Sequence, residues 1–272
     1  MFNATFSAFL EEAQFTKEIL GIGVTLLFKA DYAAKGIYYQ SFTCLSTGLE
    51  RLAKLCLILD YYICNKGMLP SERYIRDFGH EINALFFSCG DVAENRKIKF
   101  RFPFELDDIH QNILHVLDAF ADSKGRYSNI NILLGKEQTE DDPIHKWYSS
   151  VDMPLFEKHI STKKKDAFEY RARVIGKALA EFSMVQHITE DDTNLQDPVE
   201  ASRRTGVWEA VAPYRQLYTL QIIRFLTEII MGLGYKAMAV SQNEDIPYFS
   251  EIFSLFYNSD AYFRSRKTWD RL

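Results

Sequence analysis

The chain has 272 residues and a formal net charge of −5, and 47% of its residues are hydrophobic. This length and apolar content allow a sizeable buried core, which excludes a disordered chain and indicates one large domain or two smaller ones. The mild acidity excludes a surface that is basic throughout. Any contact with nucleic acid must therefore come from a local basic patch.

Neither an export signal nor a membrane span is expected. The N-terminal stretch MFNATFSAFLEEAQF lacks a basic leader and contains Glu11 and Glu12, unlike the cationic and then apolar order of an export signal. The longest apolar stretches, around 55–64 and 217–233, are too short or carry charges such as Arg224. The sequence thus predicts a cytoplasmic protein without membrane contact.

The cysteines and histidines lack the pattern of a metal or redox site. Cys44, Cys56, Cys64 and Cys89 include no close pair of the kind that binds zinc or exchanges disulfides, and free cysteines are commonly buried. The six histidines are scattered along the chain. We therefore expect reduced core cysteines, no metal and no cofactor.

Apolar residues recur at intervals of three and four through most of the chain, and glycine and proline are few, which predicts an all-α protein. The clearest stripe predicts a helix over about 33–64 that is packed along its whole length. A second helix is predicted after Pro70, with Ser71 as its cap and Glu72 in its first turn, and it should end near the SCGD turn. A third is predicted over about 104–122.

The second half shows the same periodicity. It predicts helices near 143–160, 164–188 and 208–234, and Pro247 is well placed to open a final helical region. The segment EDDTNLQDP (190–198) has the composition of an exposed connector between the last two long helices.

The acidic, turn-rich segment GKEQTEDDP indicates a boundary in the middle of the chain. We expect an antiparallel helical bundle over 1–138 and a C-terminal helical subdomain over 139–272, or one continuous domain. GIGVTLLFK (21–29) is the one segment whose composition allows a strand, but a lone strand would have no partner.

On the second predicted helix, Arg73, Asp77 and His80 are separated by four and three residues, so we expect them to share one stripe, with Arg76 beside His80 on the adjacent turn. A histidine between arginines can act as an acid or base, and an arginine can hold a phosphate, so these residues are catalytic candidates. The alternative is a surface face with an Arg73–Asp77 pair and His80 packed at its edge, because charged stripes are the usual exposed side of an amphipathic helix.

Ligand-binding candidates lie in two further segments. Glu50 and Lys54 are one helical turn apart, in the order that favours an ion pair, so a structural pair is the alternative to a functional acid. Arg126, Tyr127 and Asn129 lie in the segment GRYSNIN, and such residues on a loop can stack on a base or grip a phosphate. The alternative is that they anchor the loop to a helix end.

The C-terminal segment YFRSRKTWDRL interleaves basic and aromatic residues. It predicts either a patch for RNA or an acidic partner, or a terminal helix whose aromatic residues dock on the core. The chain has no glycine-rich phosphate loop, no nucleophile elbow and no zinc-protease helix, which disfavours the common enzyme classes.

Three segments together resemble the HEPN family of small helical domains, in particular the type found beside minimal nucleotidyltransferases. The resemblance covers roughly residues 33–135 and depends on the order and spacing of the segments. The segments are GLERLAKLCLIL with Glu50 and Lys54, GHEINALF with Gly79, His80, Glu81 and Ile82, and LDAFADSKGRYSNI with Asp118, Arg126 and Tyr127.

The resemblance implies a helical bundle that pairs as a homodimer. HEPN domains that cut RNA use an arginine and a histidine four to six residues apart near the start of the last domain helix, and two such motifs form a metal-independent site across the dimer. Here Arg73 and His80 have six residues between them, but Tyr74 follows the arginine where a polar residue is usual, and the pair lies in an earlier helix.

The leading hypothesis is therefore a HEPN-like helical protein of a microbial defence, toxin–antitoxin or stress system that binds RNA, a nucleotide or a partner protein such as a toxin or a nucleotidyltransferase. One alternative is a metal-independent HEPN endoribonuclease in which His80 is the acid or base and Arg73 or Arg76 holds the scissile phosphate. Another is an immunity or antitoxin protein whose acidity complements a basic toxin.

Overall fold

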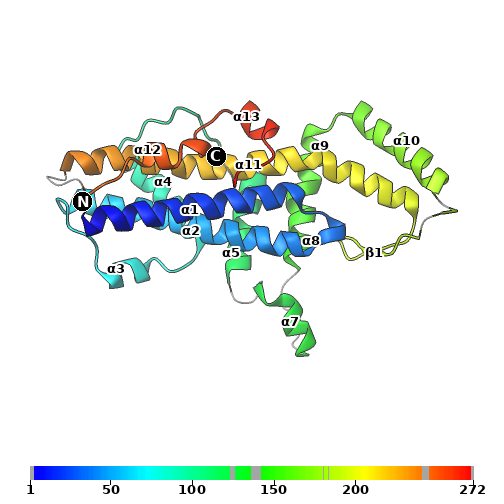
Figure 1. Ribbon diagram of the computed structural model, residues 1–272, viewed down its shortest axis with the longest axis horizontal. Helices are drawn as coiled ribbons and strands as arrows, with labels where there is room; N and C mark the ends of the chain where they lie inside the picture. The colour runs from blue at the N-terminus through cyan, green and yellow to red at the C-terminus, as the bar shows by residue number, and fades with distance from the viewer. Residues whose placement is uncertain are drawn as a thin grey trace.

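The protein is mostly helical, which confirms the all-α prediction (Figure 1). The computed structural model describes residues 3–122, 126–135, 142–179, 181–182, 184–240 and 245–270. The elements are α1 (Ala4–Lys29), η1 (Tyr32–Ala34), α2 (Gly36–Cys64), α3 (Glu72–Asp77), α4 (Ile82–Asn95), α5 (Asp108–Ala121), α7 (Ser128–Leu133), α8 (Pro143–Trp147), η2 (Tyr148–Asp152), α9 (Met153–His159), α10 (Thr162–Leu179), β1 (His187–Ile188), β2 (Asn194–Leu195), α11 (Pro198–Val240), α12 (Phe249–Ile252), η3 (Ser254–Phe256) and α13 (Asp260–Ser265).

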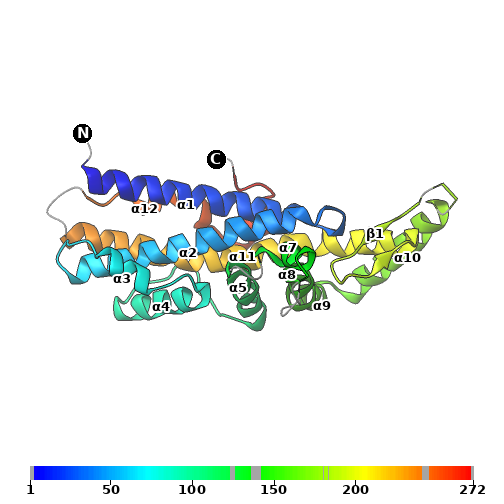
Figure 2. The ribbon, with the colours of Figure 1, turned by 90° about the horizontal axis from the view of Figure 1, so that it is seen from below.

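Three long helices, α1, α2 and α11, lie side by side and form the body of the molecule (Figures 1 and 2). The stripe that predicted the helix over 33–64 is buried, because α2 packs against α1, α4, α5 and α11. One hydrophobic cluster contains side chains from both expected units, for example Leu52 of α2 and Ile229 of α11. The division near residue 138 stays a prediction.

Residues 21–29, whose composition allowed a strand, lie inside α1. Glycines of α1 and α2 instead allow these two helices to pack closely. A Cβ atom on Gly23 would lie 2.8 Å from Leu45 Cγ, and one on Gly48 would lie 2.6 Å from Leu20 Cγ. Because larger side chains would push the helices apart, these glycines let α1 and α2 approach closely.

The helix predicted after Pro70 begins as expected but is not continuous. Ser71 caps α3, since its Oγ accepts a hydrogen bond from Tyr74 N at 3.3 Å. Gly79 then adopts φ +66° and interrupts the helix, and α4 begins only at Ile82. The prediction that Arg73, Asp77 and His80 share one stripe is therefore wrong, because His80 lies in the break.

The second half agrees in outline and differs in its boundaries. The helix near 143–160 is the continuous run α8, η2 and α9, and the one near 208–234 is the centre of the 43-residue α11. However, α10 ends at Leu179, and its apolar residues Ile175 and Leu179 are each 46% exposed. They stay exposed because α10 packs mainly on α11.

We call residues 162–179 of α10 and 198–212 of α11 the arm, because this pair extends past the end of α1 and α2 (Figure 2). The connector within it was expected to be exposed. It forms part of a small antiparallel β1–β2 hairpin, and most of it is exposed as predicted. The exceptions are Glu190 and Leu195, which are buried; Glu190 contacts the buried Arg204, which composition alone does not reveal.

The C-terminal segment packs on the body. Pro247 precedes a helical region broken into α12, η3 and α13. Phe263 and Trp269 are buried at 0% and 1% exposure, which confirms that the aromatic residues of this segment dock on the core. The carbonyl oxygen of Trp269 would lie only 2.2 Å from a Cβ on Gly21, so the segment crosses α1 closely.

The cysteine prediction is confirmed in part. All four cysteines are free, and Cys56 and Cys89 are buried, but Cys44 is half-buried and Cys64 is exposed. Among the described helices, only α11 is long and apolar enough to cross a membrane, and 78% of its most apolar window is buried inside the protein. Burial of that kind is typical of a core helix, so this helix is weak evidence for a membrane span.

Candidate functional site

Glu50, Lys54, His80 and Asp118 gather where α2, α5 and the start of α4 meet, and we call this group the polar junction. Glu50 Oε1 accepts a hydrogen bond from Lys54 Nζ at 2.8 Å and lies 2.9 Å from His80 Nδ1. Asp118 accepts from Ile82 N at 2.5 Å and thus satisfies a free amide at the start of α4. Three segments that are far apart in the sequence meet here.

The charges of the polar junction stabilise one another. Burial raises the pKa of Glu50, but hydrogen bonds from Lys54 and His80 outweigh it, so the pKa of Glu50 is lowered overall. The side chains of Glu50 and Lys54 are 21% and 16% exposed, whereas that of His80 is 82% exposed. The junction can hold His80 in one orientation and leaves its Nε2 edge toward solvent.

Arg73 and Arg76 do not join His80. Arg73 Nε lies 3.9 Å from Asp77 Oδ2, and Arg76 pairs with Glu72, so both arginines are paired within α3. Their side chains are 90% and 73% exposed. No described hydrogen bond or ion pair joins either arginine to His80, and no described groove contains the three side chains together.

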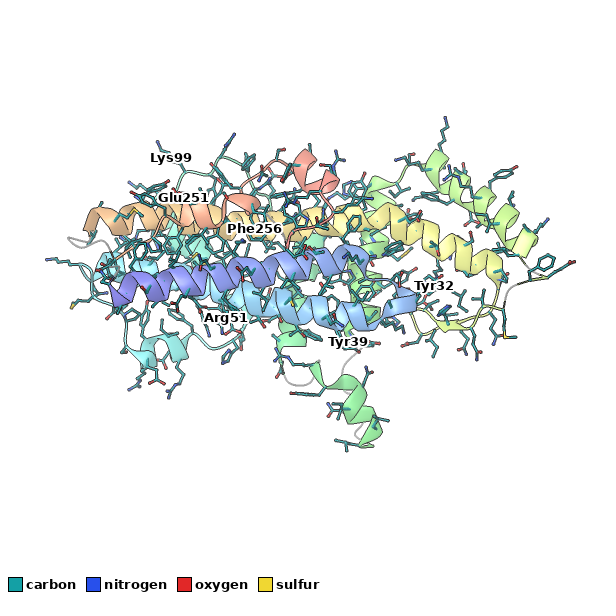
Figure 3. All side chains as sticks on the ribbon, in the orientation of Figure 1. Tyr32, Tyr39, Arg51, Lys99, Glu251 and Phe256 are labelled. Carbon is teal, nitrogen blue, oxygen red and sulfur yellow. The ribbon has the colours of Figure 1, made fainter. Side chains whose placement is uncertain are left out.

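Arg126, Tyr127 and Asn129 lie at and just before α7, which projects away from the body (Figure 1). Asn129 Nδ2 donates to Tyr39 Oη at 3.1 Å, and Figure 3 shows Tyr39 on the side of α2 toward α7. Arg126 and Tyr127 are exposed. Within the described part of the chain, no hydrogen bond or ion pair links these three residues to the polar junction, and Asn129 anchors α7 to α2.

A second charged group was not anticipated, and we call it the buried charge centre: Tyr38, Asp152, Glu190, Arg204 and Arg215. Arg215 Nη1 donates to the backbone oxygen of Ala30 at 2.9 Å and to Tyr38 Oη at 3.1 Å. Its Nη2 lies 3.1 Å from Asp152 Oδ2. Because Ala30 caps the C-terminal end of α1, the guanidinium joins this helix end to α2, η2 and α11.

The acids of this centre are held away from water. Burial raises the pKa of Asp152 to about 6, although Arg215 opposes the shift, and Trp147 Nε1 donates to Asp152 Oδ1 at 3.0 Å. Burial also raises the pKa of Glu190, and Arg204 Nη1 lies 3.9 Å from Glu190 Oε2. The centre is enclosed, so it holds structure together and cannot receive a large ligand.

The largest described groove lies between α10, α11 and α13, and we call it the basic groove. It has a volume of about 530 Å³, and its side chains include Lys164, Phe168, Arg171, Tyr214 and Arg264. The sequence analysis missed it as a site. A signal was present, because Lys164, Phe168 and Arg171 are four and three residues apart and therefore share one face of a helix.

These features define a mostly helical protein of packed helix pairs with an exposed polar junction, a buried charge centre and a basic groove. Among the described residues, no group of three or more histidine, cysteine and acidic side chains is arranged to hold a metal ion. Comparison with protein-family models, with curated proteins and with solved structures finds no match to this chain.

Proposed function

We propose that the chain is a HEPN-like helical protein that works by binding RNA or a nucleotide rather than by catalysis. The observation that carries the proposal is the polar junction, because it joins the segments on which the resemblance depends. Glu50 and Lys54 of the first segment contact His80 of the second, and Asp118 of the third caps the helix that follows His80.

Binding is favoured over cleavage by the surroundings of His80. A metal-independent nuclease needs a cation that holds the scissile phosphate near the acid or base. The two arginines nearest in sequence, Arg73 and Arg76, instead pair with acids on their own short helix. Since α3 and α4 are separated at Gly79, the arginines and the imidazole do not form one face.

The remaining parts of the proposal concern the cellular location, the oligomeric state and the biological system. A cytoplasmic homodimer of a microbial defence, toxin–antitoxin or stress system fits paired HEPN domains. The exposed apolar side chains of α7 support association with a second copy, since Ile130 is 51% exposed and Leu133 is 86% exposed. Light scattering should give twice the chain mass, and Leu133→Glu should give the single mass.

The proposed binding is tested with the purified full chain and labelled single-stranded RNA, in EDTA and at several salt concentrations. We expect saturable binding that weakens steeply with salt, because phosphate contacts release counterions, and RNA that remains intact. A protein that binds neither RNA nor free nucleotides under any of these conditions would contradict the proposal.

A metal-independent endoribonuclease is the second candidate, and one observation favours it. Glu50 holds the Nδ1 side of an exposed imidazole, which is how a carboxylate orients a catalytic histidine. If RNA is cut in EDTA, His80→Ala should abolish cleavage and Arg173→Ala, on the outer face of α10, should not. Intact RNA after long incubation removes this candidate.

A further inference from the structure

Three cations of the basic groove have no ion-pair partner among the residues that the structure describes. Lys164 and Arg171 come from α10 and Arg264 from α13. None of the ion pairs among the described residues includes any of the three. Glu209 is the one acidic side chain among the described lining residues, so within this set three positive charges face one negative charge. The groove therefore favours an anion.

His159 adjoins the groove through its contact with the lining residue Tyr214. Burial lowers the pKa of this histidine, and the cations Lys158 and Arg264 lower it further. Its ring stacks on Tyr214, with ring centres 4.3 Å apart and an angle of 9° between the planes. Tyr214 therefore contacts His159 as well as lining the groove.

Aromatic side chains also line the groove. Phe168 and Tyr214 stand on α10 and α11, and the guanidinium carbon of Arg264 lies 6.0 Å from the Tyr214 ring centre. Unpaired bases stack on aromatic rings and on arginine side chains, whereas inorganic phosphate is bound by cations alone. The aromatic rings therefore favour a ligand that contains a base. Glu209 can accept a hydrogen bond from a ribose hydroxyl or from an amino group of a base.

The size and rigidity of the groove fit a ligand larger than an inorganic anion. Its volume of about 530 Å³ lies in the range of small-molecule sites. A Cβ on Gly176 would lie 2.6 Å from Val199 Cα, so the α10 and α11 backbones are nearly in contact within the arm. This close packing holds α10 against α11 and so pre-forms the part of the groove that lies within the arm.

We propose that the basic groove binds one nucleotide unit, with the phosphate held by Lys164, Arg171 and Arg264 and the base stacked against Phe168 or Tyr214. The unit is either a free nucleotide or one residue of single-stranded RNA. This inference rests on the proposed function and names its site, which lies on the arm and the C-terminal segment, outside the residues that carry the family resemblance.

The test compares charge reversals inside and outside the groove. Arg171→Glu with Arg264→Glu removes two phosphate contacts, and Lys163→Glu with Arg173→Glu makes the same charge change at exposed positions that do not line the groove. Binding of a labelled oligouridine of about 12 nucleotides is measured by fluorescence anisotropy, and binding of AMP and UMP by calorimetry. We expect a loss of about 100-fold for the groove pair and a change within about threefold for the control pair.

The outcomes separate this inference from the proposed function. Wild-type binding that survives the groove pair, or falls equally in both pairs, overturns the groove as the site and leaves the proposed function standing. A wild-type protein that binds no RNA and no nucleotide overturns both. Binding of AMP or UMP identifies a free nucleotide as the ligand source, and binding of the oligomer alone identifies RNA.

A second measurement needs no variant and covers the case in which the groove pair fails to fold. Oligouridine carrying 4-thiouridine is crosslinked to the wild-type chain by light, and the modified peptide is identified by mass spectrometry. We expect the crosslink at Phe168 or Tyr214, because a base stacked on the ring places its sulfur close by. Crosslinks confined to α3, α4 or α7 overturn the groove assignment.

Discussion

The polar junction and the buried charge centre both join charged side chains from distant parts of the chain, but they differ in exposure. The side chain of His80 is 82% exposed, whereas that of Arg215 is 1% exposed. Water reaches His80 and partly screens Glu50 and Lys54 in the junction, but it does not reach the charges of the centre. Charged contacts therefore leave His80 of the junction accessible to a ligand, whereas in the centre they stabilise the fold.

The largest effect should follow from removing the cation of the buried charge centre. Arg215→Met leaves Asp152 and Glu190 buried without their main counter-charge, and we expect a loss of about 3–5 kcal/mol in the free energy of unfolding. Urea denaturation followed by circular dichroism measures it, with Arg173→Met as the exposed control, which should change by less than about 0.5 kcal/mol.

The double variant Arg215→Met with Asp152→Leu sharpens this result. If the loss comes from an unpaired buried acid, removing the acid as well should recover part of it. A double variant whose loss equals the sum of the two single losses would show instead that the arginine acts mainly through its bonds to the backbone oxygen of Ala30 and to Tyr38.

A second effect is a dependence of stability on pH that comes from Asp152. The pKa of this acid is raised from 3.8 to about 6 in the folded protein. The folded state therefore binds the proton more tightly than the unfolded chain, and stability falls as pH rises from about 4 to about 6. The shift corresponds to about 3 kcal/mol over that window.

Unfolding of the wild type and of Asp152→Asn across this pH range isolates the effect, because Glu190 and Asp191 titrate in both proteins. The stability difference, wild type minus variant, should decrease between pH 4 and pH 6. A difference that stays level would mean that Arg215 keeps the carboxylate charged throughout.

A smaller effect is expected for the ion pair of the polar junction. A double-mutant cycle with Glu50→Gln and Lys54→Met should give a coupling energy of about 0.2–1 kcal/mol, since the pair is one helical turn apart and partly exposed. A coupling energy above about 2 kcal/mol would mean that the ion pair of the junction stabilises the fold as strongly as a buried pair. The two groups would then not differ in their contribution to stability.

The smallest effect is expected for His80→Ala, at less than about 0.5 kcal/mol, because most of this side chain is in water. Thermal unfolding of the variant and of His115→Ala, an exposed histidine of α5, checks it. A large loss would show that the contact with Glu50 is structural, which would weaken the reason to look for a ligand there.

Local rules predicted the helices whose apolar stripes are buried and the contact between Glu50 and Lys54, which depends only on a four-residue spacing. They did not predict the break at Gly79, because glycine is also tolerated inside helices and only its positive φ reveals the break. The buried charge centre was beyond prediction for a different reason. Arg215 lies in a mostly apolar stretch of sequence, and its partners lie at the end of α1, on α2 and on η2.

The candidate site was predicted in the same uneven way. His80 and Glu50 were named individually, and their contact across thirty residues could be expected only from the resemblance. The basic groove needed the packing of α13 against α10 and α11, because Arg264 is far from Arg171 in sequence. A site whose charged residues come from distant parts of the sequence has no local sequence pattern by which it could be predicted.

Pro213 makes a point in α11 at which the arm can bend relative to the body. Proline has no backbone N–H, so α11 lacks one of its internal hydrogen bonds where the helix leaves the body. From Pro213 to Pro198 the helix extends about 22 Å, and a bend of about 10° at this joint would carry its far end about 4 Å. Pro213 also lines the basic groove. A ligand bound in the groove would therefore contact the residue about which the arm can bend.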